Sequence, residues 1–112
     1  MFYNCKNLVE IEFSNVYTWQ MIDLSEMFFG CINIKRIELQ KFQAHYIYYM
    51  NRMFYDCKNV KYINIAGFFL GSVKEYDDIF KGVGNNIIIS YNSYLMEENI
   101  ENQIKELNQS SL

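Results

Sequence analysis

The stretch Met-Phe-Tyr-Asp-Cys-Lys-Asn-Val-Lys-Tyr-Ile-Asn-Ile, residues 53–65, recurs with small changes at residues 1–13 and 27–39. The three copies lie 26 residues apart without insertions, and a weaker fourth copy begins with Ile79-Phe80. Self-similarity at a fixed period of this length is typical of stacked repeat architectures. The sequence therefore divides into 26-residue units that begin at residues 1, 27, 53 and 79.

Three positions are nearly constant among the four units. Position five is cysteine in three units and valine in the fourth, position seven is always asparagine, and position eleven is always isoleucine. These residues are Cys5, Cys31, Cys57 and Val83; Asn7, Asn33, Asn59 and Asn85; and Ile11, Ile37, Ile63 and Ile89. Agreement in four registers indicates that equivalent residues occupy equivalent places in the fold.

Each unit contains two hydrophobic periodicities. Leu8, Ile11 and Phe13 follow the β-branched and aromatic pattern of a short strand with one buried face. Later apolar residues recur every three or four positions, as on one face of a helix. In the first unit this second group is Met21, Leu24, Met27, Phe28 and Cys31. The sequence predicts one strand and one short helix in each unit.

A strand and a helix of this size cannot bury both apolar faces alone, so successive units must stack. The predicted fold class is α/β, a solenoid with parallel strands on one face and short helices on the other. Residues 1–92 form this predicted array. Residues 93–112 are predicted to form a C-terminal capping helix with a tail that frays from about residue 108. Ser93 is its candidate N-cap, and its apolar face is formed by Met96, Ile100, Ile104 and Leu107.

The constant asparagine lies between the predicted helix and the following strand. Asparagine tolerates the left-handed conformation that ends many helices, and its amide can bond nearby backbone. Position four carries turn-forming residues as well, namely Asn4, Gly30, Asp56 and Gly82. We expect a tight turn at this point of every unit.

Composition restricts the class of protein. The chain has 112 residues, 51% of them hydrophobic and 18% aromatic, which favours one small folded domain. A net charge of −3 argues against a nucleic-acid partner. No stretch approaches the roughly 20 apolar residues of a membrane span, and the chain shows no signal peptide. The first unit lacks a cap, so we expect further repeats upstream or edge-to-edge self-association through this uncapped N-terminal repeat.

Residues with reactive side chains are few. The cysteines lie 26 residues apart without a C-x2-C pair, and His45 is the single histidine, so no catalytic residue, metal site or cofactor is predicted. The cysteines are interpreted as small buried hydrophobes. A small cysteine-dependent enzyme, with a cysteine activated by His45, is the remote alternative.

The exposed face of the strands is the candidate binding surface. One predicted ladder joins Glu10, Arg36, Tyr62 and Ile88, a second joins Glu12, Glu38, Asn64 and Ser90, and a third joins Val9, Lys35, Lys61 and Ile87. Arginine and tyrosine are common interface anchors. The candidate partner-binding residues are Glu10, Glu12, Arg36, Glu38, Tyr62, Asn64 and, in the connection after the first strand, Trp19.

Residues 1–8 and 53–60 resemble the M-F-x-x-C-x-x-L core of BspA-like leucine-rich repeats, the 26-residue variant of bacterial surface lipoproteins and protist surface proteins. The resemblance covers residues 1–91. It implies a right-handed leucine-rich-repeat solenoid at the cell surface or secreted, with roles in adhesion or recognition of a protein or glycan ligand and no catalytic residue. An intracellular protein-interaction scaffold of the same architecture is the alternative.

Overall fold

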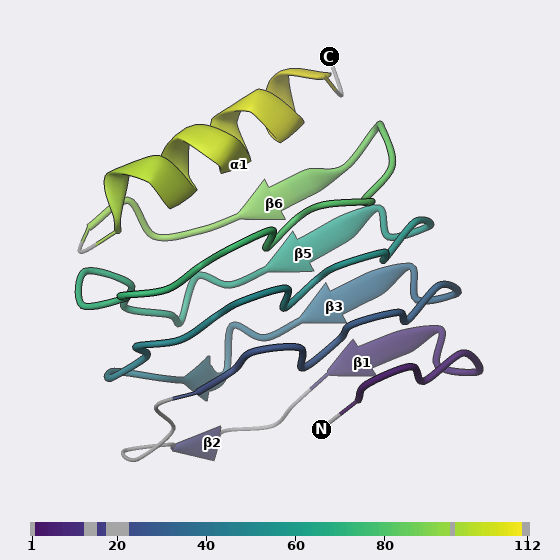
Figure 1. Ribbon diagram of the computed structural model, residues 1–112, viewed down its shortest axis with the longest axis horizontal. Helices are drawn as coiled ribbons and strands as arrows, with labels where there is room; N and C mark the ends of the chain where they lie inside the picture. The colour runs from purple at the N-terminus through teal and green to yellow at the C-terminus, as the bar shows by residue number, and fades with distance from the viewer. Residues whose placement is uncertain (1, 13–15, 18–22, 95, 111–112) are drawn as a thin grey trace.

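The computed structural model describes residues 2–12, 16–17, 23–94 and 96–110 (Figure 1). It contains six short strands followed by one helix, in the order β1 Glu10–Glu12, β2 Val16–Tyr17, β3 Arg36–Glu38, β4 Phe42–Gln43, β5 Tyr62–Asn64, β6 Ile88–Ser90 and α1 Glu98–Ser110. The main sheet is parallel, with the strand order β1-β3-β5-β6, and β2 pairs with β4 in a second parallel sheet. The chain is therefore α/β, as predicted.

The 26-residue period sets the register of the main sheet. Ile11 pairs with Ile37, Ile37 with Ile63, and Ile63 with Ile89. The last three of these isoleucines are buried, and Ile11 packs against the same core from the open end. The predicted alignment of the strands is confirmed. The second sheet, in the connection after each of the first two main strands, was not predicted.

The predicted repeat helices are wrong. In the described part of the chain α1 is the one helix, and the segments opposite the main sheet are successive turns. Left-handed residues interrupt each segment, for example Glu26 with a φ of 60° and Gly30 with a φ of 73°. Two such residues four positions apart prevent a continuous α-helical ladder. Apolar residues recur at this spacing because successive turns are closed by hydrogen bonds over three residues, as from the Met27 N–H to the Leu24 carbonyl and from the Cys31 N–H to the Phe28 carbonyl.

Backbone hydrogen bonds between successive units join these turns, and we call this set the turn ladder. The N–H groups of Leu24, Glu26, Phe28 and Gly30 donate to carbonyls in the next unit over 2.8–2.9 Å. The acceptors are the carbonyls of Tyr49, Asn51, Met53 and Tyr55. Residues 50, 52, 54 and 56 donate in the same way to residues 75, 77, 79 and 81. The turns thus pair between units much as parallel strands do.

Equivalent side chains stack along the core. The rings of Phe2, Phe28, Phe54 and Phe80 form a column with centroids 5.4, 5.8 and 5.6 Å apart and nearly parallel planes. Tyr3, Phe29 and Tyr55 form a second, outer column. Ring pairs at these distances add to the free energy gained by burial. Stacking of identical positions is what the repeat predicts.

Position four alternates between a polar side chain and glycine. Gly30 and Gly82 adopt left-handed conformations, and so do Asn4 and Asp56 in the other two units. A methyl group on Gly30 would collide with Asn4 Oδ1, and one on Gly82 would collide with Asp56 Oδ1. Each glycine therefore lies against the polar side chain of the unit before it.

The constant asparagines bond between units. Asn33 Nδ2 donates to the carbonyl of Lys6, and Asn59 Nδ2 donates to the carbonyl of Ile32, each over 2.7 Å. The prediction that these amides bond backbone is confirmed. The left-handed conformation, however, belongs to position four and to the residue before each unit, because those two places form the turns.

Helix α1 covers the last strand (Figure 1). Ile100 and Ile104 are fully buried, as predicted. The helix begins at Glu98, where Glu97 Oε2 accepts a hydrogen bond from the Ile100 N–H, so Ser93 is not the N-cap. It extends to Ser110, and within it Asn108 both donates to and accepts from the backbone of Ile89. Residues 111–112 lie outside the described part.

No helix in the described part of the chain has the length and apolar character that crossing a bilayer requires.

The alternation at position four can be tested with Gly30→Ala. The variant should lose about 1–2 kcal/mol of unfolding free energy, because alanine is strained in the left-handed region and its methyl meets Asn4. Adding Asn4→Gly should recover the part due to the collision. Gly71→Ala, at an exposed glycine without a positive φ, is the control in urea denaturation. Equal losses in Gly30→Ala and Gly71→Ala would contradict this account.

The asparagine bonds can be tested with Asn33→Ala. Loss of the amide leaves the Lys6 carbonyl without this donor and should cost about 1 kcal/mol. Asn85→Ala is the matched control, because Asn85 has the same position in its unit but bonds no described residue through its side chain. Thermal unfolding should separate the two variants, and indistinguishable melting temperatures would show that the amide bond is not stabilising.

Candidate recognition surface

The outer face of the main sheet presents the first predicted ladder. Glu10 is opposite Arg36, Arg36 is opposite Tyr62, and Tyr62 is opposite Ile88. These side chains point away from the core because the isoleucine that follows each in its strand points inward. Four strands thus place a carboxylate, a guanidinium, a phenol and an aliphatic side chain in one row.

Arg36 is the centre of this row. Its Nε lies 3.7 Å from Glu10 Oε1, and its Nη2 lies 3.8 Å from Glu38 Oε1. Its guanidinium carbon lies 4.3 Å from the centroid of the Tyr62 ring. The side chain of Arg36 remains 47% exposed, so these pairs orient it without removing it from solvent. The structure brings together four of the predicted site residues here.

The second ladder becomes more buried from β1 to β5, and Ser90 in β6 is partly exposed again. Glu12 is exposed and Glu38 is half-buried, whereas Asn64 is only 5% exposed. Asn64 Oδ1 accepts from the Ala66 N–H, and Asn64 Nδ2 donates to Gln40 Oε1. Asn64 therefore supports the turn after β5 and is not available to a partner, contrary to the prediction. Glu38 Oε2 is buried without a hydrogen-bond donor among the described residues.

The third ladder is interrupted in the last unit. Val9, Lys35 and Lys61 are exposed, but Ile87 is fully buried, so its predicted exposure is wrong. The left-handed Asn86, with a φ of 59°, turns the chain so that Ile88 N–H donates to the Lys61 carbonyl. Ile88 is consequently the exposed residue, at 57%.

Of the predicted residues, Trp19 lies outside the described part of the chain. In the connection of the next unit, the His45 ring stacks on Phe69 with centroids 4.7 Å apart. Lys74 Nζ lies 4.9 Å from the centroid of the Tyr48 ring. These contacts favour local packing of the aromatic connection residues.

The cysteines form a column beside the phenylalanines. Cys31 and Cys57 are buried, and their thiols donate to the carbonyls of Phe2 and Phe28 over 2.9 and 3.2 Å. Burial raises the pKa of the Cys31 thiol. Burial, and after it the neighbouring Cys31, raises the pKa of the Cys57 thiol from 9.0 to about 12. Thiolate nucleophiles need the opposite shift. This geometry makes Cys31 and Cys57 packing residues.

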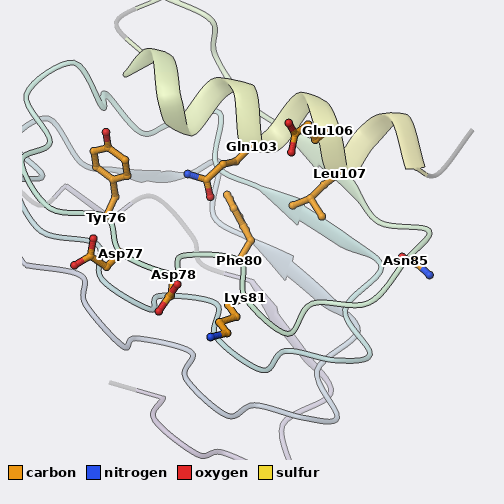
Figure 2. Close-up of a pocket in the computed structure, with 9 residues that line it drawn as sticks. All are labelled: Tyr76, Asp77, Asp78, Phe80, Lys81, Asn85, Gln103, Glu106 and Leu107. Carbon is orange, nitrogen blue, oxygen red and sulfur yellow. The ribbon is translucent and has the colours of Figure 1, made fainter.

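An open groove of about 640 Å³ lies between α1 and the last turn segment (Figure 2). Gln103 and Leu107 project from α1 toward that segment, and Phe80 projects from the segment toward them. Sequence reasoning missed this groove. The sequence could have indicated it, because the repeat pattern stops after the fourth strand. Residues 76–82 are therefore not followed by another unit in the same register.

The raised pKa of Cys57 predicts a pH dependence. The unfolded chain releases this proton near the ordinary thiol pKa of 9.0, whereas the folded chain retains it until about 12, so stability falls as the pH rises through this interval. Cys57 should contribute a loss of up to about 2 kcal/mol between about pH 9 and pH 11. Cys57→Val, which copies Val83 at the same position, should show a smaller fall in urea denaturation. Parallel pH profiles would refute this role.

No curated protein and no solved structure matches the chain. One family model, described as a Mycoplasma protein of unknown function, matches residues 1–110. That match spans both the main sheet and α1. The chain therefore belongs to this family, DUF285.

Proposed function

We propose that the chain is a right-handed repeat solenoid of the leucine-rich-repeat type, similar to BspA-like proteins, and that it is a noncatalytic binding module. The constant register of the four main strands supports the first part. The turn ladder also supports a solenoid, because its hydrogen bonds join residues nearly one unit apart on the side opposite the main sheet. Stacked units of this kind present a continuous, rigid surface to a ligand.

The observation that carries the binding function is the cluster around Arg36. A guanidinium with carboxylates on two sides and an aromatic ring beneath it is already oriented before a ligand arrives. Less side-chain entropy is then lost on binding. Arginine and tyrosine are also the side chains that most often dominate interface energies.

A protein ligand fits this surface better than a glycan. Two grooves lie away from this face, one beside α1 and one lined by Phe2, Cys5 and Leu8 at the start of the stack. Neither groove is lined by Glu10, Arg36 or Tyr62, which form a row of side chains on the outer face of the sheet. Small ligands prefer concave sites, whereas flat surfaces with charged and aromatic anchors suit proteins.

Location and assembly follow as parts of the same proposal. Display at a cell surface rests on the BspA-like resemblance. Self-association through the first unit is favoured by Phe2, Cys5 and Leu8, which are only partly buried at that end. It is opposed by the exposed Glu10 and Glu12 of β1, since two such strands side by side would bring like charges together.

The binding function can be tested with a panel of purified proteins and a glycan array, each probed with the wild-type chain. For any ligand found, Arg36→Ala and Tyr62→Ala should each weaken binding about tenfold or more, the size of an interface hot spot. Lys105→Ala, an exposed residue on α1, should change it less than about twofold.

The result contradicting the proposal is a ligand bound equally well by wild type and by the Arg36→Ala/Tyr62→Ala double variant. Circular dichroism of each variant establishes that the fold is kept. Binding found on the glycan array alone would keep the sheet face around Arg36 as the binding surface, but the ligand would then be a glycan and not a protein.

A further inference from the structure

The turn ladder ends at residues 76–82, which hold backbone N–H groups that no described residue accepts. In each earlier unit, alternate N–H groups of the turn segment donate to the next unit, as those of Met50, Arg52 and Phe54 do over 2.8–3.0 Å. The equivalent groups in the last turn segment belong to Tyr76, Asp78, Phe80 and Gly82. Among the described residues, none accepts a hydrogen bond from these four N–H groups. We call residues 76–82 the open edge.

Helix α1 closes the sheet side of the stack but not this side. Asn108 satisfies both the N–H and the carbonyl of Ile89, so its carboxamide takes the place of a further strand next to β6. At the open edge, α1 offers Asn99, whose amide donates to the Tyr76 hydroxyl rather than accepting from backbone. Within the described part of the chain, the end of the stack is therefore capped on the sheet side and not along residues 76–82.

The open edge is one wall of the groove of Figure 2, and α1 is the other. Tyr76, Asp78 and Phe80, three of the four residues with unused N–H groups, line it. A groove bounded by unpaired backbone on one wall is suited to an extended segment that adds to the edge as a strand. About 640 Å³ of space is available there.

The charge of the groove favours a basic occupant. Asp77, Asp78 and Glu106 line it, against the single cation Lys81. The chain itself contains a precedent for the pairing, since Arg52 Nη1 lies 3.9 Å from Glu26 Oε2 in the unit before. Asp78 has in the last turn segment the same position that Glu26 has in the first. An arginine in register with Asp78 would repeat this ion pair.

We propose that the open edge and α1 form a docking groove for an extended, basic peptide segment of a partner protein. The peptide lies parallel to residues 76–82, and alternate carbonyls accept hydrogen bonds from the N–H groups of Tyr76, Asp78 and Phe80. An arginine or lysine of the peptide pairs with Asp78. This site is separate from the sheet face around Arg36, so it does not depend on the proposed function.

The test uses the full chain, labelled with ¹⁵N, and a capped pentapeptide Tyr-Met-Asn-Arg-Met, the sequence of residues 49–53. In the chain, the carbonyls of residues 49, 51 and 53 accept from the preceding unit, so the peptide carries the required acceptors and the arginine. Without peptide, the amides of residues 76, 78 and 80 should exchange with solvent quickly. With low-millimolar peptide, their exchange should slow and their chemical shifts should change.

Two matched changes test the charge. Asp78→Asn keeps a residue type that tolerates the left-handed conformation, φ 53°, and should weaken peptide binding about twofold to fivefold. A peptide with glutamate in place of its arginine should bind more weakly still. Lys41→Ala, at an exposed residue between β3 and β4 that lines neither groove, should leave peptide binding unchanged.

Three results would overturn the proposal. The first is unchanged exchange at residues 76, 78 and 80 with saturating peptide, and the second is a peptide effect confined to the sheet face. The third is protection of the same amides in concentrated protein without peptide, together with dimers in sedimentation, which would assign the edge to a second copy of the chain.

Discussion

Backbone hydrogen bonds between residues about one unit apart are the constraint on which this structure depends. They run along the strands of the main sheet and again along the turn ladder, so each unit is held to the next on both sides. Buried backbone groups need such partners, and a unit this short cannot supply them internally. Equal spacing brings equivalent side chains together. It therefore produces the column of phenylalanine rings, the hydrogen bonds from the thiols of Cys31 and Cys57 to backbone carbonyls, and those from the side-chain amides of Asn33 and Asn59.

The sequence predicts the sheet more accurately than the turns, for a physical reason. A constant isoleucine every 26 residues leaves one register for the strands, and the structure has it. Apolar residues three and four positions apart fit both a helix and a series of turns. The turns form in place of a helix because Glu26, Arg52 and Asp78 adopt the left-handed conformation. Glutamate and arginine rarely adopt this conformation, so the sequence does not predict it at Glu26 and Arg52. At position four, by contrast, Asn4, Gly30, Asp56 and Gly82 are all of turn-forming types, and the turn expected there is present.

On the candidate surface too, the contacts that depend on the strand register could be predicted, and the others could not. Glu10, Arg36 and Tyr62 are neighbours because the register alone decides which side chains meet. Asn64 could not be assigned in this way, since its burial depends on the path of the chain through Gln40 and Ala66. The groove beside α1 depends on the direction of a helix outside the repeat. That direction is fixed by a few contacts, among them the bonds of Asn108 to Ile89, which no periodicity encodes.

The alternation at position four restricts how such a chain can change its length. Asn4, Gly30, Asp56 and Gly82 make the true structural period two units, or 52 residues, and the outer ring column of Tyr3, Phe29 and Tyr55 alternates with it. Deleting or duplicating a single unit would juxtapose two polar side chains or leave two glycines facing each other. Gain or loss of units in pairs keeps each glycine against a polar side chain, so a change in length by a multiple of 52 residues preserves every contact of this kind.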